Sequence, residues 1–183
     1  MPKYIMGHRA ARRSDTIRSV LLIGLLVTVA AVLQTTLLGR IRPFGVIPDL
    51  TMITVVAIAY FCGRETGAVT GIAGGFLIEA MGGGRVIVLP LVYLILCYTI
   101  GHYARAVIPK RFDVYLLMQG IAIAVRSGVT VLLACLQYRS FSLPHLLLYS
   151  TLPEILVTAA IGCALFIPLR LFCSILDRRR RIL

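Results

Sequence analysis

Apolar runs separated by short polar breaks fill most of this chain. The first run, residues 19–38, is about 20 residues long, which is enough for a helix to cross the apolar part of a bilayer. Five further runs predict helices, at residues 47–62, 67–81, 86–101, 114–138 and 153–173. The breaks contain Pro, Gly or charged residues, which are typical of helix ends. The pattern predicts an all-α membrane protein with about six transmembrane helices in one bundle.

Two parts of this prediction leave alternatives open. The second, third and fourth runs hold about 16 residues each, or roughly 24 Å of helix, which is short against a hydrocarbon core of about 30 Å. Merging the second and third runs into one span is the main rival, and the charged break at residues 63–66 opposes it. Residues 139–151 fit either an interfacial or re-entrant segment or the front of the last helix.

The composition supports lipid as the solvent. Hydrophobic residues make up 59% of the chain and charged residues only 14%, against about 25% charged residues in soluble domains. The net charge of +12 comes from Lys and Arg that gather at the two ends and in one loop, which indicates cytoplasmic membrane flanks rather than nucleic-acid binding. We therefore divide the chain into a basic cytoplasmic arm (1–18), a six-helix transmembrane domain (19–173) and a basic cytoplasmic tail (174–183).

The distribution of positive charge predicts the orientation. With the N-terminus inside and six spans, 13 of the 19 Lys and Arg residues fall on the inside and 4 on the outside. This bias agrees with the positive-inside rule and favours an even number of spans, because both basic ends then share one side. We expect both termini in the cytoplasm, and we expect the first run to be retained because it is longer than a signal-peptide core.

Four glycines recur at every fourth position: Gly63, Gly67, Gly71 and Gly75. On a helix this spacing makes a stripe without side chains, against which another helix can pack closely. The stripe serves either packing within the chain or docking of a partner helix.

Four charged residues are predicted within spans or at their ends. Asp49 and Glu154 stand in first helical turns, where a carboxylate can cap the helix. Glu79 lies near the end of the third run, and Arg126 lies near the middle of the fifth. A charge at that depth needs a partner or a wet cavity, so we expect Arg126 to pair with Glu79 or Glu154. A pocket for a polar ligand or ion and contact with a partner protein are the other interpretations.

No pattern indicates catalysis, a metal or a cofactor. The five cysteines lack CxxC spacing and lie in or beside apolar runs, so we expect neither a disulfide nor a zinc site. The three histidines are far apart, and the chain has no GxSxG, HExxH or phosphate-loop motif.

An ordered set of short motifs resembles a known family. Gln34 and Thr35 end the first helix in a Leu-Gln-Thr sequence, and Pro48, Asp49 and Leu50 open the second. The glycine-spaced helix closes in a segment that contains Phe76 and Glu79. At the position of Glu79, the family named below usually has Asp. With Tyr93 and Tyr98 in the next helix and Pro153-Glu154 opening the last, the chain resembles the rod shape-determining protein MreD family, most closely over residues 18–105.

The resemblance implies a non-enzymatic scaffold in the bacterial plasma membrane, within the elongation complex that builds lateral peptidoglycan. It implies an MreC-like protein as first partner, with the RodA glycosyltransferase and a class B penicillin-binding transpeptidase in the same machinery and MreB reached indirectly. It also implies a fold like the substrate-binding membrane subunit of energy-coupling-factor transporters. Two alternatives remain, a small-molecule binding subunit of a transporter and an intramembrane enzyme.

Overall fold

The computed structural model describes residues 3–41, 47–82, 88–106, 111–137 and 152–181, and each regular element in these ranges is a helix. In chain order the elements are α1 (Lys3–Leu33), the π-helical turn η1 (Gln34–Leu38), α2 (Gly39–Ile41), α3 (Leu50–Cys62), α4 (Arg64–Gly82), α5 (Leu89–Ala106), α6 (Phe112–Gln137) and α8 (Leu152–Arg181). The prediction of an all-helical chain is confirmed. The predicted segment 139–151 lies outside the described residues.

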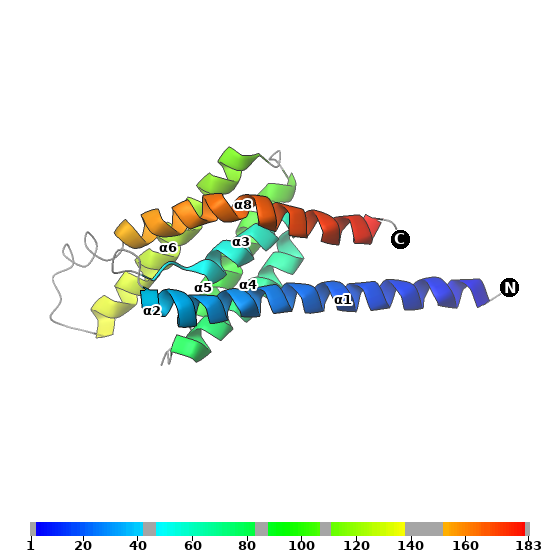
Figure 1. Ribbon diagram of the computed structural model, residues 1–183, viewed down its shortest axis with the longest axis horizontal. Coiled ribbons are helices and arrows are strands. Elements are labelled where there is room, and N and C mark those ends of the chain that lie inside the picture. The colour runs from blue at the N-terminus through cyan, green and yellow to red at the C-terminus, as the bar shows by residue number, and fades with distance from the viewer. Residues whose placement is uncertain (1–2, 42–46, 83–87, 107–110, 138–151, 182–183) are drawn as a thin grey trace.

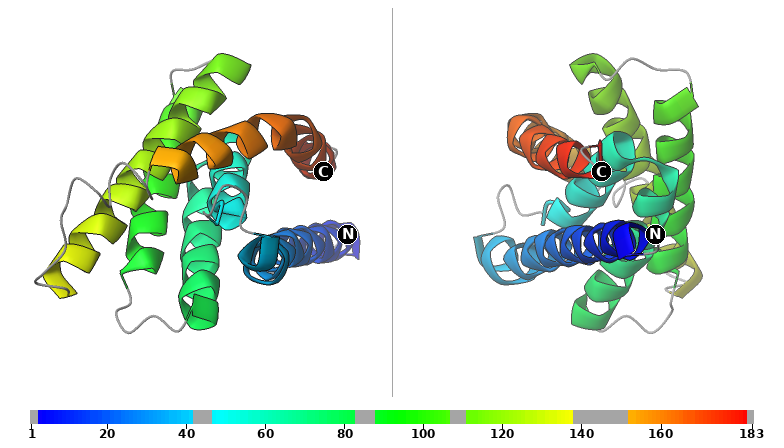
Figure 2. Two further views of the ribbon diagram at one scale, coloured as in Figure 1. Left: turned by 60° about the vertical axis from the view of Figure 1, so that its left-hand side comes forward. Right: turned by 90° about the vertical axis from the view of Figure 1, so that its right-hand side faces the viewer.

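The two outermost helices of the sequence run in opposite directions along the molecule (Figure 1). α1 leads away from the N-terminus and α8 leads back towards the C-terminus, so both ends of the chain lie at the same end of the molecule. Between them in sequence, α4, α5 and α6 stand next to one another in that order (Figure 2).

α3 is the centre of the structure. It contacts α1, α4, α5, α6 and α8, and every residue from 51 to 61 is buried. A helix that is apolar on all sides can only be stable when other helices or lipid surround it, and here the protein surrounds it. With 13 residues it is about 20 Å long, too short to cross a hydrocarbon core unaided.

Three helices are long and apolar enough to cross a membrane: Ile17–Ile41, Phe112–Leu133 and Pro153–Ile175. Two shorter apolar helices, Leu50–Cys62 and Leu89–Ala104, accompany them. Each long helix buries less than a third of its most apolar window inside the protein, which leaves apolar surface for lipid or for partners.

Several helices extend beyond the predicted runs, although the candidate membrane spans Ile17–Ile41 and Pro153–Ile175 begin and end within three residues of the predicted 19–38 and 153–173. The first helix begins at Lys3 rather than residue 19, and the last ends at Arg181 rather than residue 173, because no helix-breaking residue separates the charged ends from the apolar runs. The predicted connection at residues 63–66 shrinks to Gly63, since α4 already begins at Arg64. Gly63 has a φ of 95°, a left-handed conformation that favours glycine and turns the chain sharply between the two helices.

Candidate functional site

The N-terminus of α3 is held by side chains from other parts of the chain. Pro48 and Asp49 are buried, and Asp49 is only 1% exposed. The Met52 N–H donates to Asp49 Oδ1 at 2.9 Å, and the Ile53 N–H donates to the Asp49 carbonyl oxygen at 3.2 Å. A buried helix start needs such partners, because its first N–H groups have none within the helix. The prediction that Asp49 caps this helix is confirmed.

Gln34 supplies a second partner for the same helix start. Its Oε1 accepts a hydrogen bond from the Thr51 N–H at 2.9 Å, and the side chain is buried. Gln34 begins the π-helical turn η1, and local π-helical turns often mark functional sites. Thr35 follows with its hydroxyl bonded to the Ala31 carbonyl at 3.0 Å. Two of the motifs that carry the family resemblance therefore meet at the start of α3.

Arg126 lies at the same place. Its Nε is 3.2 Å from Asp49 Oδ2, and its Nη1 is paired with Glu154 Oε1. The side chains of Arg126, Asp49 and Glu154 are 13%, 1% and 21% exposed. Of the two partners predicted for Arg126, Glu154 is in contact. The sequence predicted Asp49 only as a helix cap. In the structure one of its oxygens does cap α3, and the other binds the guanidinium of Arg126.

Tyr93 and Thr158 complete this group. The Tyr93 hydroxyl donates to Asp49 Oδ2 at 2.5 Å, and the Asp49 N–H donates to Thr158 Oγ1 at 3.3 Å. Both side chains are fully buried. Sequence reasoning noted Tyr93 only within the family resemblance and missed Thr158, since nothing in the local pattern sets either apart. We call Gln34, Asp49, Tyr93, Arg126, Glu154 and Thr158 the polar cluster.

α6 and α8 pack antiparallel beside the polar cluster with one constant register. Arg126 meets Glu154, the Gln119 side chain lies against Gly162, and the rings of Tyr115 and Phe166 are 5.0 Å apart. Gln119 is fully buried, and neither atom of its amide has a hydrogen-bond partner among the residues that the structure describes. This interface is therefore polar at one end and aromatic at the other, with a buried, unpaired amide between them.

Glu79 is separate from the polar cluster. Its Oε2 accepts a hydrogen bond from the Leu89 N–H at 3.2 Å, so it caps the start of α5 and does not pair with Arg126. Two more residues of the family motif have other surroundings. Leu50 is half-buried in the first turn of α3, whereas Phe76 on α4 is 58% exposed.

The space beside the glycine row is occupied by neighbouring helices of the same chain. A Cβ at Gly71 would lie 2.7 Å from the Tyr93 carbonyl oxygen, and one at Gly75 would lie 2.6 Å from Pro90 Cα, both on α5. At Gly67 the nearest atom would be Ala59 Cβ on α3, at 2.6 Å. The row therefore packs α4 against its own neighbours, and a partner helix cannot occupy the same stripe. Gly63 is the turn before α4 rather than a member of the stripe.

The polar cluster joins α3, α5, α6 and α8 around Asp49, and Gln34 of η1 binds the same helix start through the Thr51 N–H. Asp49 binds the helix start, the tyrosine and the arginine at once, and such a network fixes the relative position of the elements that supply it. Among the described parts of the chain, no group of three His, Cys, Asp or Glu residues could hold a metal ion. The arrangement supports a rigid structural role.

Comparison with known proteins adds a family to this geometry. The model of the family described as rod shape-determining protein MreD matches residues 14–176. No curated protein and no solved structure matches the chain. The expected likeness to the energy-coupling-factor subunit therefore has no matching structure behind it.

Proposed function

This chain belongs to the rod shape-determining protein MreD family, and on that basis we propose that it is a non-enzymatic scaffold of the bacterial elongation complex. Family membership supports a role in determining the rod shape of the cell, and the long apolar helices support a membrane location. The proposal adds that the protein docks an MreC-like protein, together with the RodA glycosyltransferase and a class B penicillin-binding transpeptidase, and reaches MreB indirectly.

The observation that carries the proposal is the family match over residues 14–176, which includes the whole polar cluster. The geometry supports a scaffold because the buried charges contact one another directly. Two carboxylates at helix starts and a guanidinium in the middle of α6 are costly in lipid, and here they hold helices together. A scaffold needs such fixed helix positions so that its outer faces stay in register with partners.

We further propose a plasma-membrane location with six spans and both termini in the cytoplasm. Both ends of the chain lie at the same end of the molecule (Figure 1). The short α3 fits this threading because its helix start, where the backbone is irregular, is enclosed by protein and all its first N–H groups find acceptors. Reporter fusions at the two ends test the threading, and signals from opposite sides of the membrane would contradict it.

The same geometry counts against the transporter alternative. That alternative expects a ligand pocket lined by Asp49, Glu79, Arg126 and Glu154. Asp49, Arg126 and Glu154 are instead in mutual contact through the guanidinium, while Glu79 caps a different helix.

The scaffold proposal is tested by purification from membranes and by cell shape. The tagged chain, produced together with the MreC-like protein of the same genome, should retain that protein through purification in mild detergent. It should also restore rod shape to cells that lack their own copy. Restored shape without any retained MreC-like protein would contradict the docking part of the proposal, and failure in both assays would contradict the proposal as a whole.

A further inference from the structure

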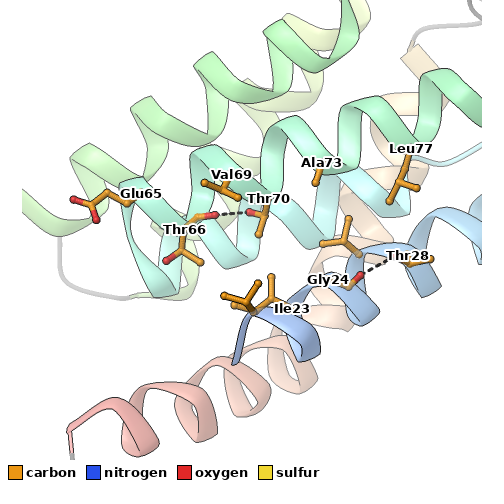
Figure 3. Close-up of a pocket in the computed structure, with 11 residues that line it drawn as sticks. Ile23, Gly24, Thr28, Glu65, Thr66, Val69, Thr70, Ala73 and Leu77 are labelled. Carbon is orange, nitrogen blue, oxygen red and sulfur yellow. Dashed lines mark hydrogen bonds between the residues drawn. The ribbon is translucent and has the colours of Figure 1, made fainter. Parts of the chain in front are cut away.

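A groove of about 400 Å³ runs between α1 and α4 (Figure 3), and none of the glycines of the row lines it. Glu65 lies at one end of the α4 wall and Leu77 at the other, and Gly24 and Thr28 stand on the α1 wall. The groove is almost entirely apolar. Two of its threonine hydroxyls are bonded to their own helices, Thr28 to the Gly24 carbonyl at 2.9 Å and Thr70 to the Thr66 carbonyl at 2.8 Å.

The walls of the groove include small residues at helical spacing, among larger apolar residues such as Val20, Val69 and Leu77. Gly24 and Thr28 are four positions apart on α1, and Thr66 and Ala73 are two turns apart on α4. Small residues at this spacing allow the backbone of another transmembrane helix to come close.

Gly24 differs in one respect from Gly71 on α4. A Cβ at Gly71 would strike the backbone of α5, so the fold itself requires glycine there. A Cβ at Gly24 would meet nothing within 4 Å. Packing within the chain therefore leaves open space beside Gly24, as it also does beside Gly82, Gly120 and Gly128, and an occupant of the groove can approach the α1 backbone there.

The charge at the groove decides between occupants. Glu65 is exposed in the first turn of α4 and makes no ion pair with any residue in the described ranges. In the proposed threading this end of α4 is cytoplasmic. Transmembrane helices carry Lys and Arg at their cytoplasmic ends, which complements Glu65. Glu65 therefore favours a helix with a basic cytoplasmic end over an uncharged occupant.

We propose that the groove between α1 and α4 binds one transmembrane helix of another protein, and that a Lys or Arg at the cytoplasmic end of that helix pairs with Glu65. This inference deepens the proposed function, because it gives the docking of a single-span partner a place on the chain. The apolar walls take the body of the helix, and Glu65 fixes its depth and direction.

The test uses two substitutions in the full-length chain with two matched controls. Ala73→Phe fills the groove, and Ala124→Phe places the same bulk at an exposed alanine of α6. Glu65→Lys reverses the charge at the groove, and Asp113→Lys reverses an exposed charge in the first turn of α6. Each variant is produced with the MreC-like protein, and the partner retained per chain is measured beside the amount of monodisperse chain.

Both groove variants should retain about tenfold less partner than the wild type, which corresponds to about 1.4 kcal/mol, while both controls retain the wild-type amount. Exchange of the partner's cytoplasmic Lys or Arg for Glu should restore binding to Glu65→Lys. Unchanged retention in both groove variants would overturn the inference and leave the scaffold proposal standing. No retention by the wild-type chain would instead count against the scaffold proposal.

A photo-reactive residue at Val69, which is 67% exposed at the groove, identifies the occupant directly. A crosslink to the transmembrane helix of the MreC-like protein supports the inference. A crosslink to a second copy of this chain, or to lipid alone, overturns it. The same probe at Leu132 on α6, which is 61% exposed, is the control and should not crosslink to that helix.

Discussion

Arg126 Nε lies 3.2 Å from Asp49 Oδ2, so the guanidinium of α6 is paired with the residue that caps α3. Asp49 thereby has two structural roles through its two oxygens. The carboxylate is 1% exposed, and its charge is balanced only if the arginine stays in place. The stability of the central helix and the position of α6 are therefore linked.

Loss of the guanidinium should be strongly destabilising. Arg126→Met leaves a buried carboxylate without its counter-charge, which costs about 3–5 kcal/mol, and this should lower the midpoint of thermal unfolding in detergent. The control is Arg170→Met, since Arg170 is exposed and its guanidinium carbon lies 6.0 Å from the centre of the Phe166 ring. That contact is worth only about 0.5–1 kcal/mol.

A second substitution separates the charge effect from lost packing. Asp49→Asn keeps an oxygen for the Met52 N–H but removes the buried charge. The double variant Arg126→Met with Asp49→Asn should therefore be more stable than Arg126→Met alone. Equal stability of the two would show that the arginine acts through its volume rather than its charge.

Tyr93 should contribute through its hydroxyl. Tyr93→Phe removes the donor to Asp49 Oδ2 and should cost about 1.5–3 kcal/mol, the range for hydrogen bonds to charged groups. Tyr98→Phe on the same helix is the control. Tyr98 is 45% exposed, so this variant should unfold at the wild-type temperature. If Tyr93→Phe and Tyr98→Phe unfold together, the hydrogen bond has no net value in this setting.

The sequence predicted this region only in part, and the reason is the range of the interactions. Asp49 after Pro48 is a local capping signal, and Arg126 within an apolar run demands a partner wherever the chain folds. The choice of that partner depends on how α6 crosses α3, which no local pattern encodes. Thr158 and Tyr93 are polar groups inside apolar helices, and only the packed structure shows that they face Asp49.

The glycine row illustrates the opposite situation. Its spacing predicted close helix packing, and the structure brings α5 within reach of a Cβ at Gly71 and Gly75. The spacing could not tell whether the neighbouring helix belongs to the same chain or to a partner, because both present the same apolar surface. The helix ends were predicted less well, since charged residues such as those before residue 19 continue a helix as readily as they end one.

Alanine substitutions should separate the two kinds of glycine. Gly71→Ala places a Cβ 2.7 Å from a backbone carbonyl oxygen of α5 that cannot move alone, which should cost about 1–3 kcal/mol. Gly128→Ala on α6 meets nothing within 4 Å and should be neutral or slightly stabilising, because alanine is the better helix former. Thermal unfolding of the two purified variants gives the comparison, and a stable Gly71→Ala variant would show that α4 and α5 can separate without penalty.

Two buried glutamines should respond to the same substitution with opposite sign. Gln119→Leu removes an amide that has no hydrogen-bond partner in the described structure, so it should raise the midpoint of unfolding by relieving a cost of about 1–3 kcal/mol. Gln34→Leu removes the acceptor of the Thr51 N–H and should lower the midpoint by a similar amount. Both residues are nearly or fully buried, so the lost side-chain packing is comparable. A destabilised Gln119→Leu variant would show that the amide is paired in the membrane, for example with a buried water, and would contradict the prediction.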